Sequence, residues 1–276
     1  MLRLIQNFLL YIPKDFFYLI SKLRIFFKIK QKLYYLKFKP NLIKSPNSEI
    51  IKKLDKDGIV EIKNYLSNEE IKYFLKIINK EVKDIFENKY KKSEVYNSED
   101  DGKLVYNVNY NSNNKIYEKL NNDKYINEII SSYVRKKVKP SSTVVELKYG
   151  KNKLDELISE HSDDWKYRVK VFFILEDIKK NNTPMRYFLN THKEYNWKKN
   201  HNYLSWAFEA TPITPYVFRK IVKKEKIVEK VCTAKAGSLI IADTRGFHGG
   251  SVLKSGRRIQ FIAIYNPLEK KRFRTA

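Results

Sequence analysis

The feature that most constrains the fold is residues 160–175, where the polar triplet His161-Ser162-Asp163 runs directly into a segment with strong strand character. Aromatic and β-branched residues dominate the second half of this stretch, which becomes fully apolar toward its end. Side chains two residues apart at the edge of a strand lie on the same side, so the imidazole of His161 and the carboxylate of Asp163 can share one ion. This spacing favours Asp163 over the adjacent Asp164 as the second ligand.

An H-x-D triplet often arises by chance, but a second block near the C-terminus offers a third ligand. Residues 236–243 are typical of a strand that follows a glycine turn, and a short loop leads through His248 to a further strand at 259–265. Two histidines and one carboxylate, which leave three positions open, form the facial triad of non-haem Fe(II) oxygenases. An arginine at the start of the next strand is suited to pair with the carboxylate of a cosubstrate.

With these residues in view, the chain resembles the phytanoyl-CoA dioxygenase family of Fe(II)- and 2-oxoglutarate-dependent oxygenases over roughly residues 54–267. The third of four matching blocks departs from the family's N-G-P and P-G-S-H pattern, because Thr183 and Asn190-Thr191 stand in place of Gly and Gly-Ser. These departures concern the shape of a loop and leave the metal ligands untouched. The blocks, in chain order, are Asp57-Gly58-Ile59-Val60, His161-Ser162-Asp163, residues 181–193 and residues 237–258.

The resemblance implies roles for individual residues. It makes His161, Asp163 and His248 the iron ligands, and it makes Arg257 the partner of the C5 carboxylate of 2-oxoglutarate. Arg258 is the alternative partner, because a shift of one residue turns a strand side chain to the opposite face.

Two other polar residues near these blocks, His192 and Asp243, have two interpretations each. His192 is expected either to pack in the interior or to line the 2-oxoglutarate pocket. Asp243 either orients a ligand histidine or simply ends a strand. Arg245 and Lys170 lie close to the triplet and the third ligand in the sequence, which makes them candidates for contacts with substrate.

Helical patterns come before most of the strand patterns in this chain. The segment Ser67-Asn68-Glu69-Glu70 is a capping box, and the helix that it opens carries an apolar stripe as far as Phe86. We expect an α+β, mainly β fold, a double-stranded β-helix of the jelly-roll, cupin-like kind with helices packed on one face. A second helix is predicted around residues 116–133, and early strands are predicted at 59–62, 104–108 and 143–149.

The amino-acid composition limits the cellular compartment and the binding partners that we expect for this protein. The single cysteine, Cys232, excludes an intramolecular disulfide and a zinc–thiolate cluster, which favours a reducing, cytoplasmic location. The formal charge of +25 is typical either of a surface for nucleic acid or anionic membrane, or of an AT-rich genome. Because the lysines are scattered along all 276 residues, we favour the second explanation for the overall excess.

The N-terminal segment, residues 1–44, is expected to be a basic helical extension of a catalytic domain at 45–276. It carries ten Lys and Arg residues against one acid, Asp15, among many large apolar side chains. Its apolar runs are shorter than the ~18 residues that a membrane span needs, and it lacks the cleavage site of a signal peptide. The segment therefore either lies on an anionic membrane surface as amphipathic helices or packs on the domain.

The function implied by the resemblance is hydroxylation of a C–H bond in a small-molecule, lipid or glycan-precursor substrate, with release of succinate and CO2. Fe(II) and 2-oxoglutarate would be the cofactors, and Asp163 argues against a halogenase, which needs that position for chloride. The alternative is a non-catalytic, basic peripheral membrane protein that retains the fold. A nucleic-acid-modifying oxygenase is a further hypothesis, and it predicts salt-sensitive binding to DNA or RNA.

Overall fold

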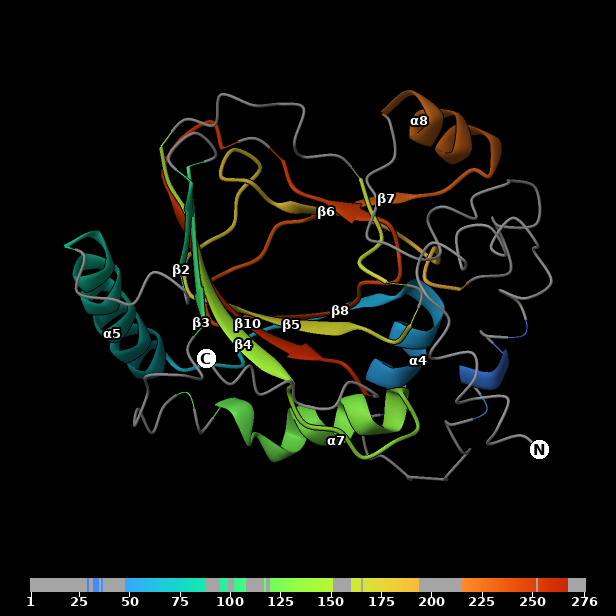
Figure 1. The fold of residues 1–276 in the computed structure, drawn as a ribbon, viewed down its shortest axis with the longest axis horizontal. Helices are drawn as coiled ribbons and strands as arrows, with labels where there is room; N and C mark the ends of the chain where they lie inside the picture. Colours follow the sequence, from blue (N-terminus) through green and yellow to red (C-terminus); the bar gives the residue numbers. More distant parts are fainter. Residues whose placement is uncertain are drawn as a thin grey trace, which may run out of the picture.

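Two antiparallel β-sheets face each other in the computed structural model (Figure 1). The structure describes residues 29, 32–34, 36, 48–87, 95–98, 102–107, 117, 120–150, 160–164, 166–193, 215–251 and 253–267. The seven-stranded sheet has the order β1 (Ile59–Ile62), β8 (Leu239–Asp243), β5 (Val169–Ile174), β10 (Arg258–Tyr265), β4 (Ser142–Lys148), β3 (Lys103–Asn107) and β2 (Val95–Ser98). The three-stranded sheet has the order β7 (Glu229–Cys232), β6 (Met185–Phe188) and β9 (His248–Gly249). The predicted jelly-roll with its added helices is confirmed.

Side-chain alternation along the strands of the large sheet separates two faces. In β4, Val145 and Leu147 belong to the main apolar core, while Glu146 and Lys148 line a cavity between the sheets. β10 repeats this pattern, with every second side chain turned to the outer core. The large sheet therefore has one apolar face for helices and one mixed face toward the smaller sheet.

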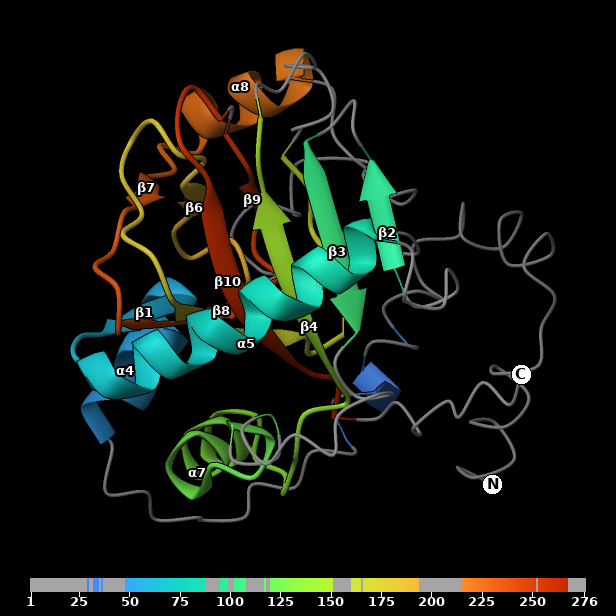
Figure 2. The ribbon, with the colours of Figure 1, turned by 90° about the vertical axis from the view of Figure 1, so that its left-hand side faces the viewer.

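Helix α5 (Asn68–Phe86) covers the outer face of the large sheet and crosses its strands diagonally (Figure 2). The predicted capping box is present, because the Ser67 hydroxyl accepts from the Glu70 N–H and the Glu70 carboxylate accepts from the Ser67 N–H. Its predicted stripe is buried at Ile71, Phe74 and Ile78. The helix is thus held by both its cap and its apolar face.

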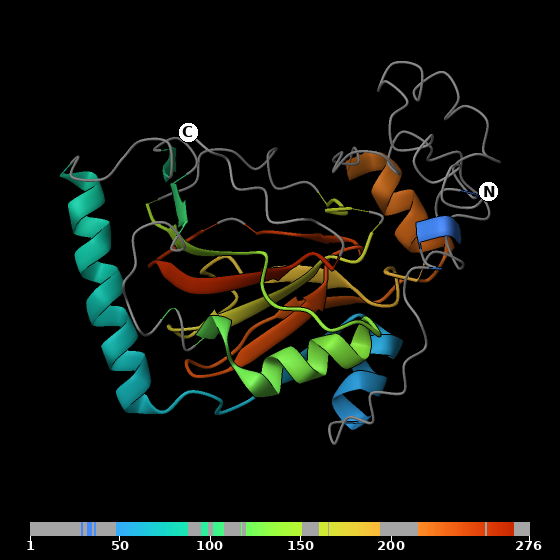
Figure 3. The ribbon, with the colours of Figure 1, turned by 60° about the horizontal axis from the view of Figure 1, so that its bottom comes forward.

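Two further helices pack near the lower edge of the sheet (Figure 3). Helix α7 (Lys124–Tyr133) begins later than the predicted 116–133, because the carboxylate of Asp123 accepts from the Ile126 N–H and caps a new helix there. Helix α4 (Ser48–Asp57) was not anticipated from the sequence. Its fully buried Leu54 anchors it to the same core.

Helix α8 (Pro215–Lys224), also unanticipated, packs beside the smaller sheet. The Phe218 ring lies edge-on to Phe188 and Phe247, with ring centroids 4.6 and 5.3 Å away. These aromatic contacts place α8 behind the segment that carries His248.

Little of residues 1–44 belongs to the described part of the chain. Tyr34 is buried, and its hydroxyl accepts a hydrogen bond of 3.0 Å from the Tyr167 N–H. This contact favours packing on the domain for that residue, and the proposed membrane helices lie mostly outside the described residues. Among the described helices, none combines the length and apolar character that a bilayer crossing requires.

Candidate metal centre

Backbone hydrogen bonds bring the predicted ligands His161, Asp163 and His248 together. His161 and His248 face each other in an isolated antiparallel bridge, with reciprocal N–H to carbonyl bonds of 2.9 and 3.0 Å. The Asp163 N–H donates to the Thr244 carbonyl at 2.9 Å. Two segments that are far apart in the sequence are therefore held in register by main-chain contacts, and the side chains inherit that geometry.

The three side chains converge on one point. The Nε2 atoms of His161 and His248 lie 3.6 and 3.7 Å from the same carboxylate oxygen, Oδ1 of Asp163. One potential ligand atom from each residue lies within 4.8 Å of the others, which is the spacing of a site that could hold a metal ion. Two imidazoles and one carboxylate make a donor set suited to a divalent transition metal.

The tautomer of His248 is set by its neighbours. The ring is buried, and its Nδ1 lies 2.9 Å from the Gly246 carbonyl, which can only accept a hydrogen bond. A neutral imidazole that donates from Nδ1 keeps its lone pair on Nε2, the atom that faces Asp163.

Electrostatics keep two of these groups in the form that binds metal. Burial lowers the pKa of His248 to about 4, although Asp163 opposes the shift, so this imidazole is neutral at pH 7. Burial by itself raises the pKa of Asp163, but the nearby Lys170 ammonium and the His248 imidazole outweigh it and hold that pKa well below its usual value. A neutral imidazole and an ionised carboxylate bind metal without first losing a proton.

Lys170 was a candidate for substrate contact, and the structure places it beside the metal-binding group. Its ammonium lies 2.7 Å from Oδ2 of Asp163, the oxygen that is not shared between the histidines. The Asp163 carboxylate is thus divided between Oδ1, which faces the two imidazoles, and Oδ2, which faces a cation.

A cavity of about 250 Å³ opens beside His161 and His248 between the two sheets. The inner face of the large sheet supplies an apolar part of the lining, which includes Phe172, Ile240 and Ile262. The same face continues over three neighbouring strands with charged and amide side chains, namely Lys103, Glu146, Lys148, Arg258 and Gln260. The space can therefore take a ligand with both charged and apolar parts.

The two adjacent arginines have different environments. Arg257 points away from the cavity, is about half exposed at 48%, and pairs with Glu176 at 2.8 Å. Arg258 is buried, lines the cavity, and donates to the Thr183 carbonyl and the Glu146 carboxylate. Of the two arginines that the resemblance offers as partners of 2-oxoglutarate, Arg258 therefore lines the cavity, on the inner face of β10, and Arg257 does not.

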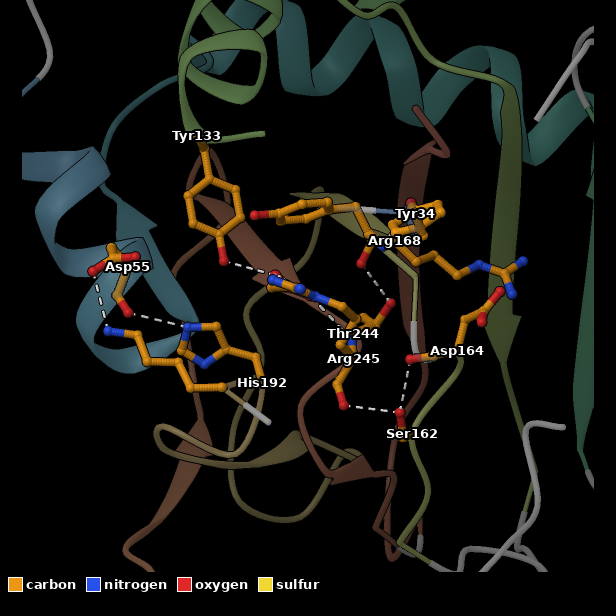
Figure 4. A network of polar contacts seen from close by, with 12 residues as sticks. Tyr34, Asp55, Tyr133, Ser162, Asp164, Arg168, His192, Thr244 and Arg245 are labelled. Carbon is orange, nitrogen blue, oxygen red and sulfur yellow. Dashed lines mark hydrogen bonds and ion pairs between the residues drawn. The ribbon is translucent and has the colours of Figure 1, made fainter. Parts of the chain in front are cut away.

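His192 does not line this cavity, contrary to the second of its two interpretations. It is buried against α4, where its Nε2 lies 3.1 Å from the Asp55 carbonyl (Figure 4). Burial lowers the pKa of His192, so the ring is neutral and serves the interior packing that was its first interpretation. Gly58 makes room for it, because a Cβ there would collide with the His192 ring and the Tyr187 hydroxyl.

Asp243 and Arg245 stabilise the loop that leads to His248 and do not contact the ligands directly. The Arg245 guanidinium makes a two-pronged contact with the fully buried Asp243 carboxylate and stacks 3.9 Å from the centre of the Tyr167 ring. The Tyr133 hydroxyl donates to the same carboxylate at 2.6 Å. Figure 4 shows this network, in which Ser162 also donates to the Arg245 carbonyl. Arg245 is therefore held in the structure and is not placed to bind substrate.

The substituted glycine positions keep the backbone shape that glycine favours. Thr183 has φ +60° and Asn190 has φ +63°, both in the left-handed region. Asparagine enters that region more readily than most residues. For Thr183, the carbonyl that accepts from Arg258 contributes to holding the strained conformation.

Sequence reasoning missed the polar wall of the cavity at Lys103, Glu146 and Lys148. A signal was present, because Glu146 and Lys148 alternate with Val145 and Leu147 in a predicted strand. Alternation showed that they share a face, but nothing local showed that this face borders the metal centre.

Comparisons with known proteins agree on the fold. The chain resembles SnoN, an epimerase solved with Fe³⁺, α-ketoglutarate and nogalamycin RO, with 13% identity, a TM-score of 0.59, and 79% of this chain and 82% of that chain covered. It resembles EctD from S. alaskensis, solved with 2-oxoglutarate and 5-hydroxyectoine, with 14% identity, a TM-score of 0.63, and coverage of 83% and 78%. It also resembles HygX from Streptomyces hygroscopicus, solved with nickel and 2-oxoglutarate, with 12% identity, a TM-score of 0.58, and coverage of 81% and 88%.

No model of a known protein family matches the chain, and no curated protein matches it in sequence. The phytanoyl-CoA dioxygenase family therefore stays a resemblance. At these identities the solved structures establish the fold that this chain shares with Fe- and 2-oxoglutarate-dependent enzymes.

Proposed function

We propose that this protein is an Fe(II)- and 2-oxoglutarate-dependent dioxygenase that hydroxylates a C–H bond of a small-molecule, lipid or glycan-precursor substrate. The observation that carries the proposal is the convergence of His161, Asp163 and His248 on one point beside a cavity that also contains the buried Arg258. Structural neighbours solved with Fe³⁺ or nickel together with the same keto acid support it.

The side chains present fit the metal. His161, Asp163 and His248 would hold Fe(II), since both Nε2 atoms lie within 3.7 Å of one carboxylate oxygen of Asp163. When bound, the metal and keto acid supply the oxidising chemistry, in which 2-oxoglutarate yields CO2 and succinate while one O2 atom enters succinate and the other the substrate C–H bond.

The side chains also fit the keto acid. The Arg258 guanidinium is buried, its two terminal nitrogens are bonded to Thr183 and Glu146, and its Nε is buried without a hydrogen-bond partner among the described residues. A buried donor without an acceptor is costly, and a carboxylate oxygen would satisfy it. We assign Arg258 as the partner of the C5 carboxylate of 2-oxoglutarate.

The remaining walls of the cavity hold and orient the substrate. Apolar side chains such as Phe172 and Ile262 exclude water from the space beside the metal ligands. Asp163 fills the position that a halogenase leaves open for chloride, so hydroxylation is the outcome that we assign.

The proposal is tested by measuring succinate formation and O2 uptake with Fe(II) and 2-oxoglutarate in the absence of added substrate. We expect slow turnover in the wild type, and loss of turnover in His161→Ala and in Asp163→Asn. Asp164→Asn is the matched control, because Asp164 lies next in the chain but its carboxylate accepts from the Lys166 N–H.

Metal-dependent binding of 2-oxoglutarate is measured beside turnover. Binding without turnover would leave the cofactor assignment in place and require the substrate for activity. Absence of both would contradict the proposal and favour the non-catalytic protein that retains the fold.

A further inference from the structure

Three cationic side chains form a row across neighbouring strands of the large sheet. Lys103 on β3 lies directly opposite Lys148 on β4, and Lys148 lies directly opposite Arg258 on β10. Residues directly opposite in antiparallel strands point to the same face, and all three side chains line the cavity described above. We refer to Lys103, Lys148 and Arg258 as the cation row.

Such a row is unfavourable in a sheet without a compensating charge. Like charges directly opposite each other destabilise paired strands, and the repulsion grows as water is excluded. Glu146, which lies two residues before Lys148 on β4, supplies a compensating negative charge. Its carboxylate pairs with Arg258, accepts a hydrogen bond of 3.0 Å from Gln260 and lies 3.5 Å from the Lys103 ammonium.

The pKa of Glu146 shows how strongly the neighbouring cations stabilise its negative charge. Burial raises its pKa, but Arg258, Lys103 and Lys148 outweigh burial and lower that pKa to about 2. Among the described residues that line this end of the cavity, Glu146 is the sole carboxylate, against the three cations of the row. Lys170 also lines the cavity, but its ammonium pairs with Asp163. Among the described residues, this end of the cavity therefore carries more positive than negative side chains.

An independent observation points to a ligand at this end. The Nε of Arg258 is a buried donor without a hydrogen-bond partner among the described residues, on a side chain that is only 7% exposed. Under the proposed function, one carboxylate of 2-oxoglutarate would satisfy that donor. The row continues beyond it over two more strands, which is wider than one carboxylate needs.

Loading the site does not remove this positive charge. A divalent metal and a dianionic keto acid cancel each other, so the cation row keeps its electrostatic character when both are bound. With Arg258 assigned to the cosubstrate, the ammonium groups of Lys103 and Lys148 still line the cavity and can donate to a further anionic group.

We propose that Lys103 and Lys148 form an anion subsite for the substrate, which therefore carries a carboxylate or a phosphate group. This inference rests on the proposed function and names its substrate class. Arg258 takes the cosubstrate carboxylate, and the two lysines on the adjoining strands hold the anionic group of the substrate. The metal centre lies in the wall of the same cavity, through His161 and His248.

The test uses inorganic sulfate as a probe of the subsite. The full-length protein is loaded with Mn(II) and N-oxalylglycine, an unreactive mimic of 2-oxoglutarate, and sulfate is titrated by calorimetry at constant ionic strength. We expect saturable binding by the wild type that weakens about tenfold or more in Lys103→Gln/Lys148→Gln, because the variant removes both charge-assisted donors. Lys103→Arg/Lys148→Arg, which keeps both charges, is expected to retain binding.

Lys76→Gln/Lys80→Gln is the matched control, because it removes the same two charges from exposed positions of α5. Sulfate affinity equal to that of the wild type is expected there. Circular dichroism and thermal unfolding check that each variant is folded.

A second measurement distinguishes a site for the substrate from a site for the cosubstrate. N-oxalylglycine affinity is expected to change by less than about threefold in Lys103→Gln/Lys148→Gln, and by about tenfold or more in Arg258→Lys. Equal weakening in both proteins would assign the whole row to the cosubstrate and overturn the inference.

Two further outcomes distinguish failure of the anion subsite from failure of the proposed function. Sulfate binding that is absent from the wild type, or unchanged in Lys103→Gln/Lys148→Gln, would overturn the anion subsite while N-oxalylglycine binding upholds the proposed function. Absence of metal-dependent N-oxalylglycine binding in the wild type would overturn both.

Discussion

At the scale of single residues, two neighbours of the same type differ completely in environment. Arg257 and Arg258 are adjacent on one strand edge, yet one pairs with Glu176 near the surface and the other is buried between Thr183 and Glu146. The alternation of a β-strand is enough to explain the difference. Which of the two faces the cavity is a question of register.

Conservative substitution of each arginine separates their roles. Arg258→Lys is expected to weaken N-oxalylglycine binding about tenfold or more, because lysine keeps the charge but loses the guanidinium's several fixed donors. Arg257→Lys is expected to stay within about twofold of the wild type, since its partner Glu176 lies outside the cavity. Calorimetric titration of the Mn(II)-loaded proteins measures both. A larger effect from Arg257 would restore it as the cosubstrate residue.

At the scale of elements, the loop between β8 and β9 leads to His248, a candidate metal ligand, and is held by a buried ion pair. The Asp243 carboxylate is fully buried, and it receives Arg245 from the loop and the Tyr133 hydroxyl from α7. Breaking a buried pair costs much more than breaking an exposed one, because a charge is left without a partner.

Asp243→Asn is therefore expected to lower the free energy of unfolding by about 3–5 kcal/mol, as is typical when one partner of a buried pair is removed. Asp177→Asn is the matched control, because Asp177 pairs with Lys235, whose side chain is 82% exposed, and its loss is expected to cost about 1 kcal/mol or less. Urea unfolding at pH 7 measures both values. Equal losses would show that the Asp243 pair does not stabilise the loop.

The ion pair between Glu146 on β4 and Arg258 on the neighbouring strand β10 predicts that the stability of the protein depends on pH. The pKa of Glu146 is about 2 in the folded protein, below the usual value of about 4.3 in an unfolded chain. The unfolded state then binds the extra proton first, so the contribution of Glu146 is complete above pH 4.3 and is lost as the pH falls toward 2.

Glu146→Gln is expected to be less stable than the wild type at pH 7, and the difference should narrow between pH 5 and about pH 3. Glu49→Gln provides the comparison, because Glu49 is 84% exposed and should show no such narrowing. Urea unfolding at several pH values provides the curves. A constant difference for Glu146→Gln would contradict the assigned role of its charge.

At the scale of the whole molecule, helices cover one face of the large sheet and the smaller sheet covers the other (Figures 1 and 2). The cavity lies between the sheets, where polar side chains can face a ligand without weakening the helix-side core. Tyr34 of the N-terminal segment takes part in this assembly, because its hydroxyl accepts from the Tyr167 N–H close in sequence to His161 and Asp163.

Tyr34→Phe removes that acceptor and leaves a main-chain donor without it, so we expect a loss of about 1–3 kcal/mol in the free energy of unfolding. Tyr73→Phe is the control, because Tyr73 is 56% exposed on α5 and its substitution should be within about 0.5 kcal/mol of the wild type. Thermal and urea unfolding measure the two variants. A neutral Tyr34→Phe would show that this contact does not fasten the segment to the domain.

The sequence by itself determined the local chemistry and the order of the elements. The spacing of His161 and Asp163, the later His248, the capping box at Ser67 and the alternation in β4 are local patterns, and local patterns follow from the periods of strand and helix. They were sufficient to predict a jelly-roll with a two-histidine, one-carboxylate group.

Only the tertiary structure decided which side chains meet across the sheets. Strand register turned Arg258 inward and Arg257 outward, aligned Lys103 with Lys148, and left His192 behind α4. Register depends on the pairing of segments that lie 45 or 110 residues apart, such as Lys103 with Lys148 and Lys148 with Arg258, and no local pattern encodes it.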